Sequence, residues 1–356
     1  MTSPAHRSIR IPRLLRIVQG VPSAVGSLSD LMRQPTRYLV VHSGAASVTG
    51  YGARFMGEGR RIGLDVEEFV AAGNSDASVQ AVTQAIDAVR PGVVVGVGGG
   101  RLVDVAKMAA AEKTADFVSV PTQASSDGIC SPVAVIHSAD GRPRSLGARI
   151  PIGIVVDMDE LRSAPLETWR SGLGDLVSNL SAVRDWRMAH AVHGEPIDDF
   201  ACLTAEAAAG SVIQNDADLT ERGFQERLIR GLILSGIAME MSGSSRPASG
   251  SEHLISHALD SILDRPRHHG LQVALATIAA YVLRDEPCDD IVRFFRVTGL
   301  PVLPRDLGIS TDEFMSAVRE GRSTRPDRWT VLDIVGETEF RRLRNLYDGG
   351  GRGLWM

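Results

Sequence analysis

The first part of the chain alternates short apolar runs with segments in which apolar residues recur at helical spacing. Val93–Val97 (VVVGV) is a β-branched run, which is typical of a strand buried on both faces of a sheet. This alternation of strands and helices predicts a parallel sheet covered by helices on both faces. The predicted elements are the strands Tyr38–His42, Val93–Val97 and Phe117–Val120, the extended segment Ile150–Val156, and the helices Ser47–Gly59, Asp76–Val89 and Leu102–Glu112.

The pattern changes near residue 160, where strand signals fade and long helical patterns follow. We therefore expect an α/β dinucleotide-binding domain with a Rossmann-like parallel sheet in residues 1–160, and an all-α domain in residues 161–356. The helices predicted in the second domain are Leu173–Met188, Asp198–Val212, Glu226–Met241, Glu252–Leu263 and His269–Arg284.

A glycine-rich turn, Gly98-Gly99-Gly100, joins the strand Val93–Val97 to the helix that follows it. In this layout the backbone can approach a ligand closely, and the first amides of the helix point at an anion such as a phosphate. The spacing is not the G-x-G-x-x-G fingerprint, so a tight turn without a ligand is the alternative. Asp104 and Lys107 share a face of the helix. They either form a surface ion pair or frame the cofactor site.

Asp175, His253 and His269 are candidate metal ligands, because a carboxylate and two imidazoles suit Zn²⁺ or Fe²⁺ and leave a position for substrate. We expect Asp175 and His269 at helix starts. Ser249 and Glu252 are spaced as a capping box, which predicts a helix that begins just before His253. His257 lies four residues further on the same face. The alternative is an ordinary surface pair of histidines and an aspartate that only caps a helix.

The composition is that of a soluble globular protein, with 44% hydrophobic and 23% charged residues. The formal net charge of -5 gives no general attraction to nucleic acid. Cys130, Cys202 and Cys288 lie far apart and form no C-x-x-C pair, which fits a reducing, cytoplasmic compartment. No signal peptide and no apolar run long enough for membrane insertion are recognisable. The sequence leaves open whether the chain is a homo-oligomer.

These motifs together resemble the sn-glycerol-1-phosphate dehydrogenases, a branch of the iron-containing alcohol dehydrogenase and glycerol dehydrogenase superfamily. The resemblance extends to about residue 280. Three residues of the second loop depart from the family pattern: Ser126 stands where a histidine is usual, and Gln123 and Cys130 replace small residues. The motifs that carry the resemblance are Gly98–Gly100 with Asp104 and Lys107, Pro121–Gly128 with Ser131-Pro132, Gly172–Asp175, Ser245–His253, and His269-Gly270.

The resemblance implies a dehydroquinate synthase-like architecture and a role for each matching residue. Asp127 and His257 would be catalytic and would contact substrate, and Asp175 would border the substrate as well. The metal would be zinc, with Fe²⁺ or Ni²⁺ as alternatives, and its ligands would be Asp175, His253 and His269. Residues that would bind NAD or NADP are Gly98, Gly99, Gly100, Arg101 and Leu102 at the pyrophosphate, and Thr122, Ser125 and Ser131 at the nicotinamide half.

The expected activity is interconversion of a small phosphorylated ketone and its alcohol, with dihydroxyacetone phosphate and sn-glycerol 1-phosphate as the best candidates. Arg246 is a candidate anchor for the phosphate, and the alternative is that it packs or pairs with an acidic neighbour. His42-Ser43-Gly44 ends its strand without a carboxylate that would bind the ribose 2′-hydroxyl of NAD, so the choice between NAD and NADP stays open and the enzyme can use NADP or both.

Three other functions stay open. One is a dehydrogenase of another polyol or of a specialised-metabolite ketone. The second is a dehydroquinate-synthase-like cyclase. Such cyclases use a set of active-site lysines and arginines, and this chain has only two lysines, Lys107 and Lys113. The third is a non-catalytic binding protein on the same scaffold.

Overall fold

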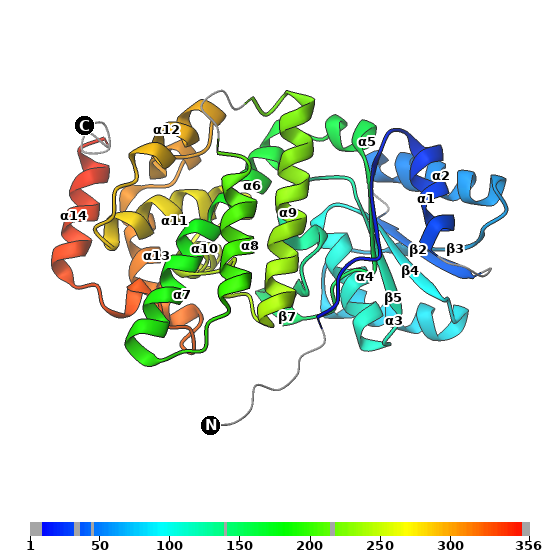
Figure 1. The fold of residues 1–356 in the computed structure, drawn as a ribbon, viewed down its shortest axis with the longest axis horizontal. Helices are drawn as coiled ribbons and strands as arrows, with labels where there is room; N and C mark the ends of the chain where they lie inside the picture. The colour runs from blue at the N-terminus through cyan, green and yellow to red at the C-terminus, as the bar shows by residue number, and fades with distance from the viewer. Residues whose placement is uncertain (1–8, 32–35, 44–45, 139–140, 214–217, 351–356) are drawn as a thin grey trace.

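The computed structural model describes residues 9–31, 36–43, 46–138, 141–213 and 218–350. A six-stranded sheet forms one end of the molecule and a group of helices forms the other (Figure 1). Every pairing in the sheet is parallel, in the order β1-β8-β5-β4-β2-β3. The predicted parallel sheet is therefore confirmed. Its strands are β1 (Leu14–Val18), β2 (Arg37–Ser43), β3 (Asp65–Ala71), β4 (Val93–Gly98), β5 (Asp116–Pro121) and β8 (Gly153–Asp157).

Helices cover both faces of this sheet. On one face α3 (Asp76–Val89) and α4 (Gly100–Glu112) pack with Val82 and Val103 against the apolar side chains of the inner strands. On the other face α1 (Val21–Leu31) and α2 (Ala46–Arg61) contribute Leu28 and Phe55 to a second core. The inner strands are thus buried from both sides, which explains their continuous apolar character.

The chain reverses its direction across the sheet between β2 and β4. After β2 it adds β3 on one side, and it then returns through α3 to place β4 on the other side of β2. In open parallel sheets ligands bind at the carboxyl ends of the strands beside such a switch point. Gly98–Gly100 lies there, at the end of β4.

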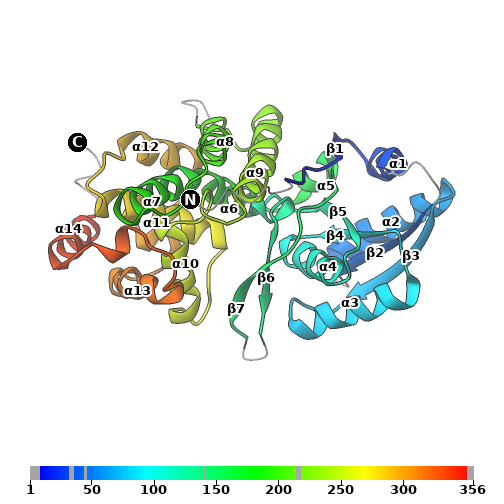
Figure 2. The same ribbon diagram turned by 60° about the horizontal axis from the view of Figure 1, so that its bottom comes forward.

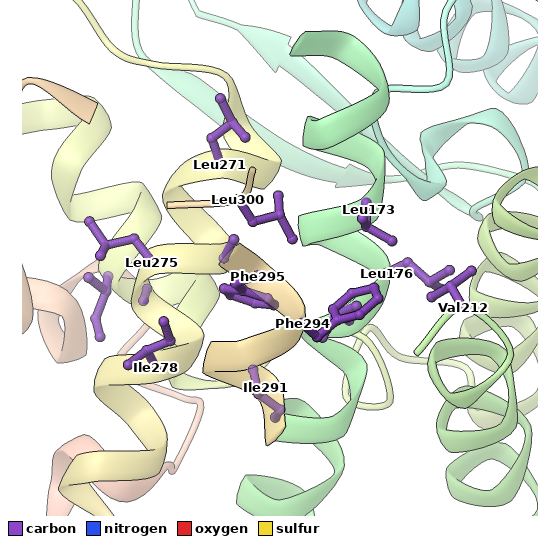
Figure 3. Packing of buried hydrophobic residues seen from close by; sticks show 14 of the residues in the cluster. Leu173, Leu176, Val212, Leu271, Leu275, Ile278, Ile291, Phe294, Phe295 and Leu300 are labelled. Atoms are coloured by element: carbon purple, nitrogen blue, oxygen red, sulfur yellow. The ribbon is translucent and has the colours of Figure 1, made fainter. Parts of the chain in front are cut away.

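After β8 the regular elements of the described residues are helices joined by loops. Side chains from α6 (Leu166–Val177), α11 (His269–Leu283) and α12 (Asp289–Thr298) face one another in the largest apolar core (Figure 3). Between the two ends of the molecule, β6 (Val133–His137) and β7 (Pro143–Gly147) form an antiparallel hairpin that projects from the body (Figure 2). The helices are α5 (Met158–Ser163), α6 (Leu166–Val177), α7 (Asn179–His193), α8 (Asp199–Gly210), α9 (Arg222–Ser242), α10 (Ser251–Ile262), α11 (His269–Leu283), α12 (Asp289–Thr298), α13 (Thr311–Thr324) and α14 (Glu337–Asp348), with short 3₁₀ turns at Asp127–Ile129, Pro304–Leu307 and Val331–Asp333.

Two expectations about helix starts are wrong. The segment predicted as one helix from Leu173 to Met188 is two helices, and the first of them starts at Leu166, directly after Pro165. Asp175 therefore lies in the last turn of α6 and not at a helix start. The N-cap of α10 is Gly250 rather than Ser249, and since glycine has no side chain to cap the helix, Ser251 N donates to Asp185 Oδ2 at 2.7 Å instead. His269 does begin α11, as expected.

Among the described residues, no helix combines the length and apolar character that crossing a bilayer requires. Gly44, which we expected at the end of the predicted strand Tyr38–His42, lies outside the described residues.

Candidate metal and nucleotide site

Asp175, His253 and His269 converge from three helices, α6, α10 and α11. One ligand atom of each lies within 4.8 Å of the other two. Asp175 Oδ1 is 3.5 Å from His253 Nε2 and 3.7 Å from His269 Nε2. A tetrahedral ion with bonds of about 2.0–2.1 Å holds its ligand atoms roughly 3.4 Å apart. The three side chains thus fit one small divalent cation.

The far nitrogen of each imidazole has its own partner. His253 Nδ1 lies 3.1 Å from Glu252 Oε1, and His269 Nδ1 lies 3.3 Å from Ser256 Oγ. Partners of this kind hold a metal-binding histidine in the tautomer whose other nitrogen is free to coordinate. In both residues the nitrogen left free is Nε2, the one that faces Asp175.

Without an ion the site already favours positive charge. Burial opposes charging of His253, but its hydrogen bonds to Asp175 and Glu252 raise its pKa to about 9. Burial opposes ionisation of Asp175 as well, yet the His253 and His269 rings lower its pKa. Two carboxylates around one imidazole thus create a place where a cation is stabilised.

Glycines bring two of the three ligands together. A methyl group on Gly174 would lie 2.2 Å from the carbonyl oxygen of Gly270, and one on Gly270 would lie 1.8 Å from the carbonyl oxygen of Ser171. Only glycine permits α6 and α11 to cross at this distance. Asp175 follows Gly174 and His269 precedes Gly270, so the crossing sets the separation of the two ligands.

The loop after β5 reaches the same centre. A methyl group on Gly172 would lie 2.0 Å from Ala124 O, so α6 packs directly on this loop. Asp127 N donates to Asp175 Oδ2 at 2.8 Å, and Ser235 Oγ donates to Asp127 Oδ2 at 2.9 Å. Burial and the neighbouring Asp175 carboxylate raise the pKa of Asp127 to about 7. The candidate catalytic carboxyl is therefore poised to gain or lose a proton near neutral pH.

His257 lies beside the trio and is not part of it. Its ring stacks on that of His269 at a centroid distance of 6.1 Å, and its side chain is 29% exposed. Burial, followed by the His269 and His253 rings, lowers the pKa of His257 to about 3. His257 is thus a neutral imidazole next to the centre, able to donate or accept one hydrogen bond.

The glycine turn has the geometry that close approach of a ligand requires. A methyl group on Gly98 would lie 2.5 Å from the Leu102 side chain, and no side chain caps α4 at Gly99. Thr122 N donates to Gly98 O, which ties the loop after β5 to the turn. Arg101 is exposed, whereas Leu102 is 5% exposed and packs in the core. Gly98, Gly99, Gly100 and Thr122 therefore lie together, and Ser125 Oγ is 3.6 Å from a methyl group placed on Gly100.

Lys107 links this turn to the Asp127 loop. Its Nζ lies 3.0 Å from Asp104 Oδ1 and donates to Gly128 O at 3.0 Å and to Ser131 O at 3.2 Å. The lysine side chain is fully buried, so the surface ion pair considered from the sequence is wrong. The Ser131 hydroxyl is itself used within the loop, where it donates to Val133 O.

Arg246 does not face the centre with a free charge. It is 4% exposed, its Nε donates to Glu195 Oε1 at 2.6 Å, and its NH1 donates to Trp329 O at 2.7 Å. This is the acidic pairing that was the alternative for Arg246, and its charge is already matched. We correct the expectation that Arg246 anchors the substrate phosphate.

Comparison with known proteins shows which family the chain resembles in sequence. The chain is 35% identical over 339 residues to the glycerol-1-phosphate dehydrogenase [NAD(P)+] of Cenarchaeum symbiosum, covering 95% of each chain. It is 36% identical to the enzyme of that name from Hyperthermus butylicus, covering 94% of this chain and 95% of the relative.

The chain belongs to the glycerol-1-phosphate dehydrogenase family.

The suspected resemblance is thereby confirmed. The family model described as iron-containing alcohol dehydrogenase matches residues 18–165 of the chain. The crystal structure of a probable glycerol dehydrogenase from Sinorhizobium meliloti superposes with a TM-score of 0.76 at 24% identity, covering 98% of this chain and 99% of that one. This likeness supports the fold described above for this chain, an α/β part followed by an all-α part.

Sequence reasoning missed three residues that support the site, Glu252, Ser256 and Ser235, and it missed the buried structural role of Lys107. Glu252 had been assigned only to a capping box, and its Oε1 does accept from Gly250 N at 2.5 Å. Its position directly before a candidate metal histidine is a signal that could have suggested the additional contact with the imidazole. No comparable signal marks Ser235, because it comes from α9, far away in the sequence.

Proposed function

We propose that this protein is a metal-dependent, NAD(P)-linked oxidoreductase that interconverts dihydroxyacetone phosphate and sn-glycerol 1-phosphate. The observation that carries the proposal is the contact between Asp127 N and Asp175 Oδ2, since it joins the candidate metal centre to the loop after β5, which the hydrogen bond from Thr122 N to Gly98 O ties to the glycine turn. The names of the relatives, glycerol-1-phosphate dehydrogenase [NAD(P)+], supply the substrate and the cofactor class.

We propose zinc as the ion, with Fe²⁺ or Ni²⁺ as alternatives, held by Asp175, His253 and His269. The donor set supports this choice, because imidazole suits these metals and the Glu252 and Ser256 contacts leave both Nε2 atoms available. When bound, such an ion polarises a carbonyl oxygen and stabilises negative charge on it. The nicotinamide supplies the hydride.

The chain itself would position the reactants and handle the proton. Gly98–Gly100 and the first amides of α4 would bind the cofactor pyrophosphate, with Arg101 and Leu102 beside it, while Thr122, Ser125 and Ser131 would lie along the nicotinamide half. Asp127 and Asp175 would border the substrate. His257 would hydrogen-bond a substrate oxygen as a neutral imidazole, and the side chain is exposed enough to exchange its proton with solvent.

In this proposal residues 1–160 form the dinucleotide-binding unit and residues 161–356 the metal- and substrate-binding unit. The cofactor can be NAD or NADP. Glu68 on β3 brings a carboxylate to the end of β2, where His42 Nε2 lies 2.8 Å from Glu68 Oε1. A carboxylate near this strand end favours a free ribose 2′-hydroxyl over a 2′-phosphate. Comparing NADH with NADPH as electron donor tests this part of the proposal.

The decisive experiment is an NAD(P)H oxidation assay with the protein loaded with one defined metal. We expect turnover with dihydroxyacetone phosphate and far less with dihydroxyacetone. Stoichiometric oxidation of the nicotinamide separates this activity from a cyclase, which recycles its NAD. A preference for an unphosphorylated ketone would contradict the proposed substrate, but the protein would still be an NAD(P)-linked ketone reductase.

His253→Ala tests the metal assignment separately. We expect the variant to lose the bound ion and the activity together, whereas Ser211→Ala, at the C-cap of α8, serves as a control that keeps both. Full metal content with full activity in His253→Ala would remove His253 from the ligand set.

A further inference from the structure

Three arginines come together where the loop after α9 meets the loop after α13, and their charges are matched very unequally. Arg246 forms the ion pair with Glu195 described above. Arg325 has only a long contact of 4.0 Å to Asp327, whose side chain is 81% exposed. Arg328 forms no ion pair with any carboxylate in the part of the chain that the structure describes.

Of Arg325 and Arg328, Arg328 gives the stronger indication of a missing counter-ion, because it is only 5% exposed. Its NH1 donates to Ser249 O at 2.5 Å and its NH2 donates to Ser245 Oγ at 3.0 Å, so its partners are neutral oxygens. A buried guanidinium keeps its charge and is costly without a counter-ion. The structure around Arg328 therefore lacks one negative charge.

Arg325 points to the same hydroxyl group. Its NH1 donates to Ser245 Oγ at 3.2 Å, so two guanidinium groups meet at one oxygen atom. Like charges held this close repel one another unless an anion lies between them. Burial and the neighbouring Arg325 and Arg246 lower the pKa of Arg328 to about 9.

The arginine pair lies beside the start of α10, the helix that carries His253 and His257, because Arg328 NH1 donates to Ser249 O just before this helix. The Arg325 and Arg328 charges help to lower the pKa of His257, after burial and the two neighbouring imidazoles, while the His257 ring stacks on His269. Arg325 directly follows α13, and the end of α13 is held against α10 because Thr324 Oγ1 donates to Leu254 O at 3.4 Å. A molecule with its carbonyl at the metal centre and an anionic group near the start of α10 would match this placement of charges.

We propose that Arg325, Arg328 and Ser245 form the subsite for the phosphate group of the substrate. This inference rests on the proposed function, and it gives to these residues the role first considered for Arg246. A phosphate offers three oxygens to the two guanidinium groups, and charge-assisted hydrogen bonds from arginine to phosphate are strong and directional. The Ser245 hydroxyl, which now accepts from both arginines, can instead donate to the phosphate.

The test compares Arg325→Ala with Arg322→Ala, which removes an exposed arginine one turn earlier on α13, paired with Asp333. For Arg325→Ala we expect the KM for dihydroxyacetone phosphate to rise about 10-fold to 100-fold, the loss expected for hydrogen bonds to a charged group. The KM for dihydroxyacetone and all constants of Arg322→Ala should stay unchanged. Arg328→Lys, which keeps the buried charge but not the planar fork, should raise the same KM without unfolding the protein.

Inorganic phosphate gives a readout that needs no turnover. We expect calorimetric titration to detect its binding to the wild-type protein and to Arg322→Ala, and to find it weakened in Arg325→Ala. Equal phosphate binding by all three proteins, or no binding by any, would overturn the subsite, and so would an unchanged KM for a phosphorylated substrate in Arg325→Ala. If the wild type reduces no phosphorylated ketone, the proposed function fails, and the phosphate titration still decides the subsite.

Discussion

Replacing Gly270 by alanine should separate two metal ligands without touching either of them. The added methyl carbon would lie 1.8 Å from Ser171 O and 2.6 Å from Ser171 C. A separation of at least about 3 Å is required, so α6 and α11 must move apart by about 1.2 Å or more. Asp175 Oδ1 and His269 Nε2, now 3.7 Å apart, would then lie too far from each other to share one small ion. Overpacking of this kind costs about 1–3 kcal/mol of folding free energy.

Metal content and urea unfolding measure the two effects. Gly270→Ala should bind the metal far more weakly than the wild type and unfold at lower urea. Gly57→Ala, in the exposed part of α2, is the matched control, because no atom lies within 4 Å of its new methyl group. It should be neutral or more stable by up to about 1 kcal/mol, since alanine favours the helix. One ion per chain at wild-type affinity in Gly270→Ala would refute the role of the crossing.

Three further outcomes follow from other contacts. Glu252→Ala removes the partner of His253 Nδ1 and should weaken metal binding about 10-fold to 100-fold. Competition with a coloured chelator measures this affinity, and an unchanged value would show that the contact does not orient the ring. Lys107→Met leaves Asp104 buried without its cation and should lower the free energy of unfolding by about 3–5 kcal/mol. Adding Asp104→Asn should recover part of that loss, and additive losses would contradict the pairing. Chelation of the metal should abolish ketone reduction and leave the far-ultraviolet circular dichroism intact, because the helical core packs through apolar side chains and not through the ion.

The strands that the sequence predicts and those that it misses differ in their place in the sheet. The predicted strands and the extended segment correspond to β2, β4, β5 and β8, which lie in the interior of the sheet order. The missed strands of this sheet, β1 and β3, are its two edges, and the separate hairpin of β6 and β7 was not predicted either. An interior strand of a parallel sheet is buried on both faces and is apolar throughout, whereas β3 (DVEEFVA) exposes most of its side chains. The pattern of apolar residues thus reports burial, and it detects a strand only where burial is complete.

The candidate site divides in the same way between local and long-range information. The identity of the metal trio and of Asp127 came from short motifs, and the structure brings these residues together. The sequence could not predict whether Arg246 or Arg325 carries a charge without a counter-ion. Arg246 pairs with Glu195 and Arg325 contacts Ser245, and both partners are distant in the sequence from the arginine that they contact. Charge pairing between remote loops leaves no periodic trace.

The glycines near the ligands show why a correct motif can accompany a wrong local structure. Gly174 precedes Asp175, which we expected at a helix start. The structure instead places Gly174 inside α6, where a methyl group would collide with Gly270 O at 2.2 Å. Gly250, three residues before His253, likewise faces α7, since a methyl group there would lie 2.9 Å from Ala182 Cα. A glycine needed for helix contact looks the same in sequence as a glycine needed for a turn. The distance between the metal ligands is therefore set by backbone contacts between helices, and a substitution at Gly174 or Gly270 should act on the metal as severely as one at a ligand.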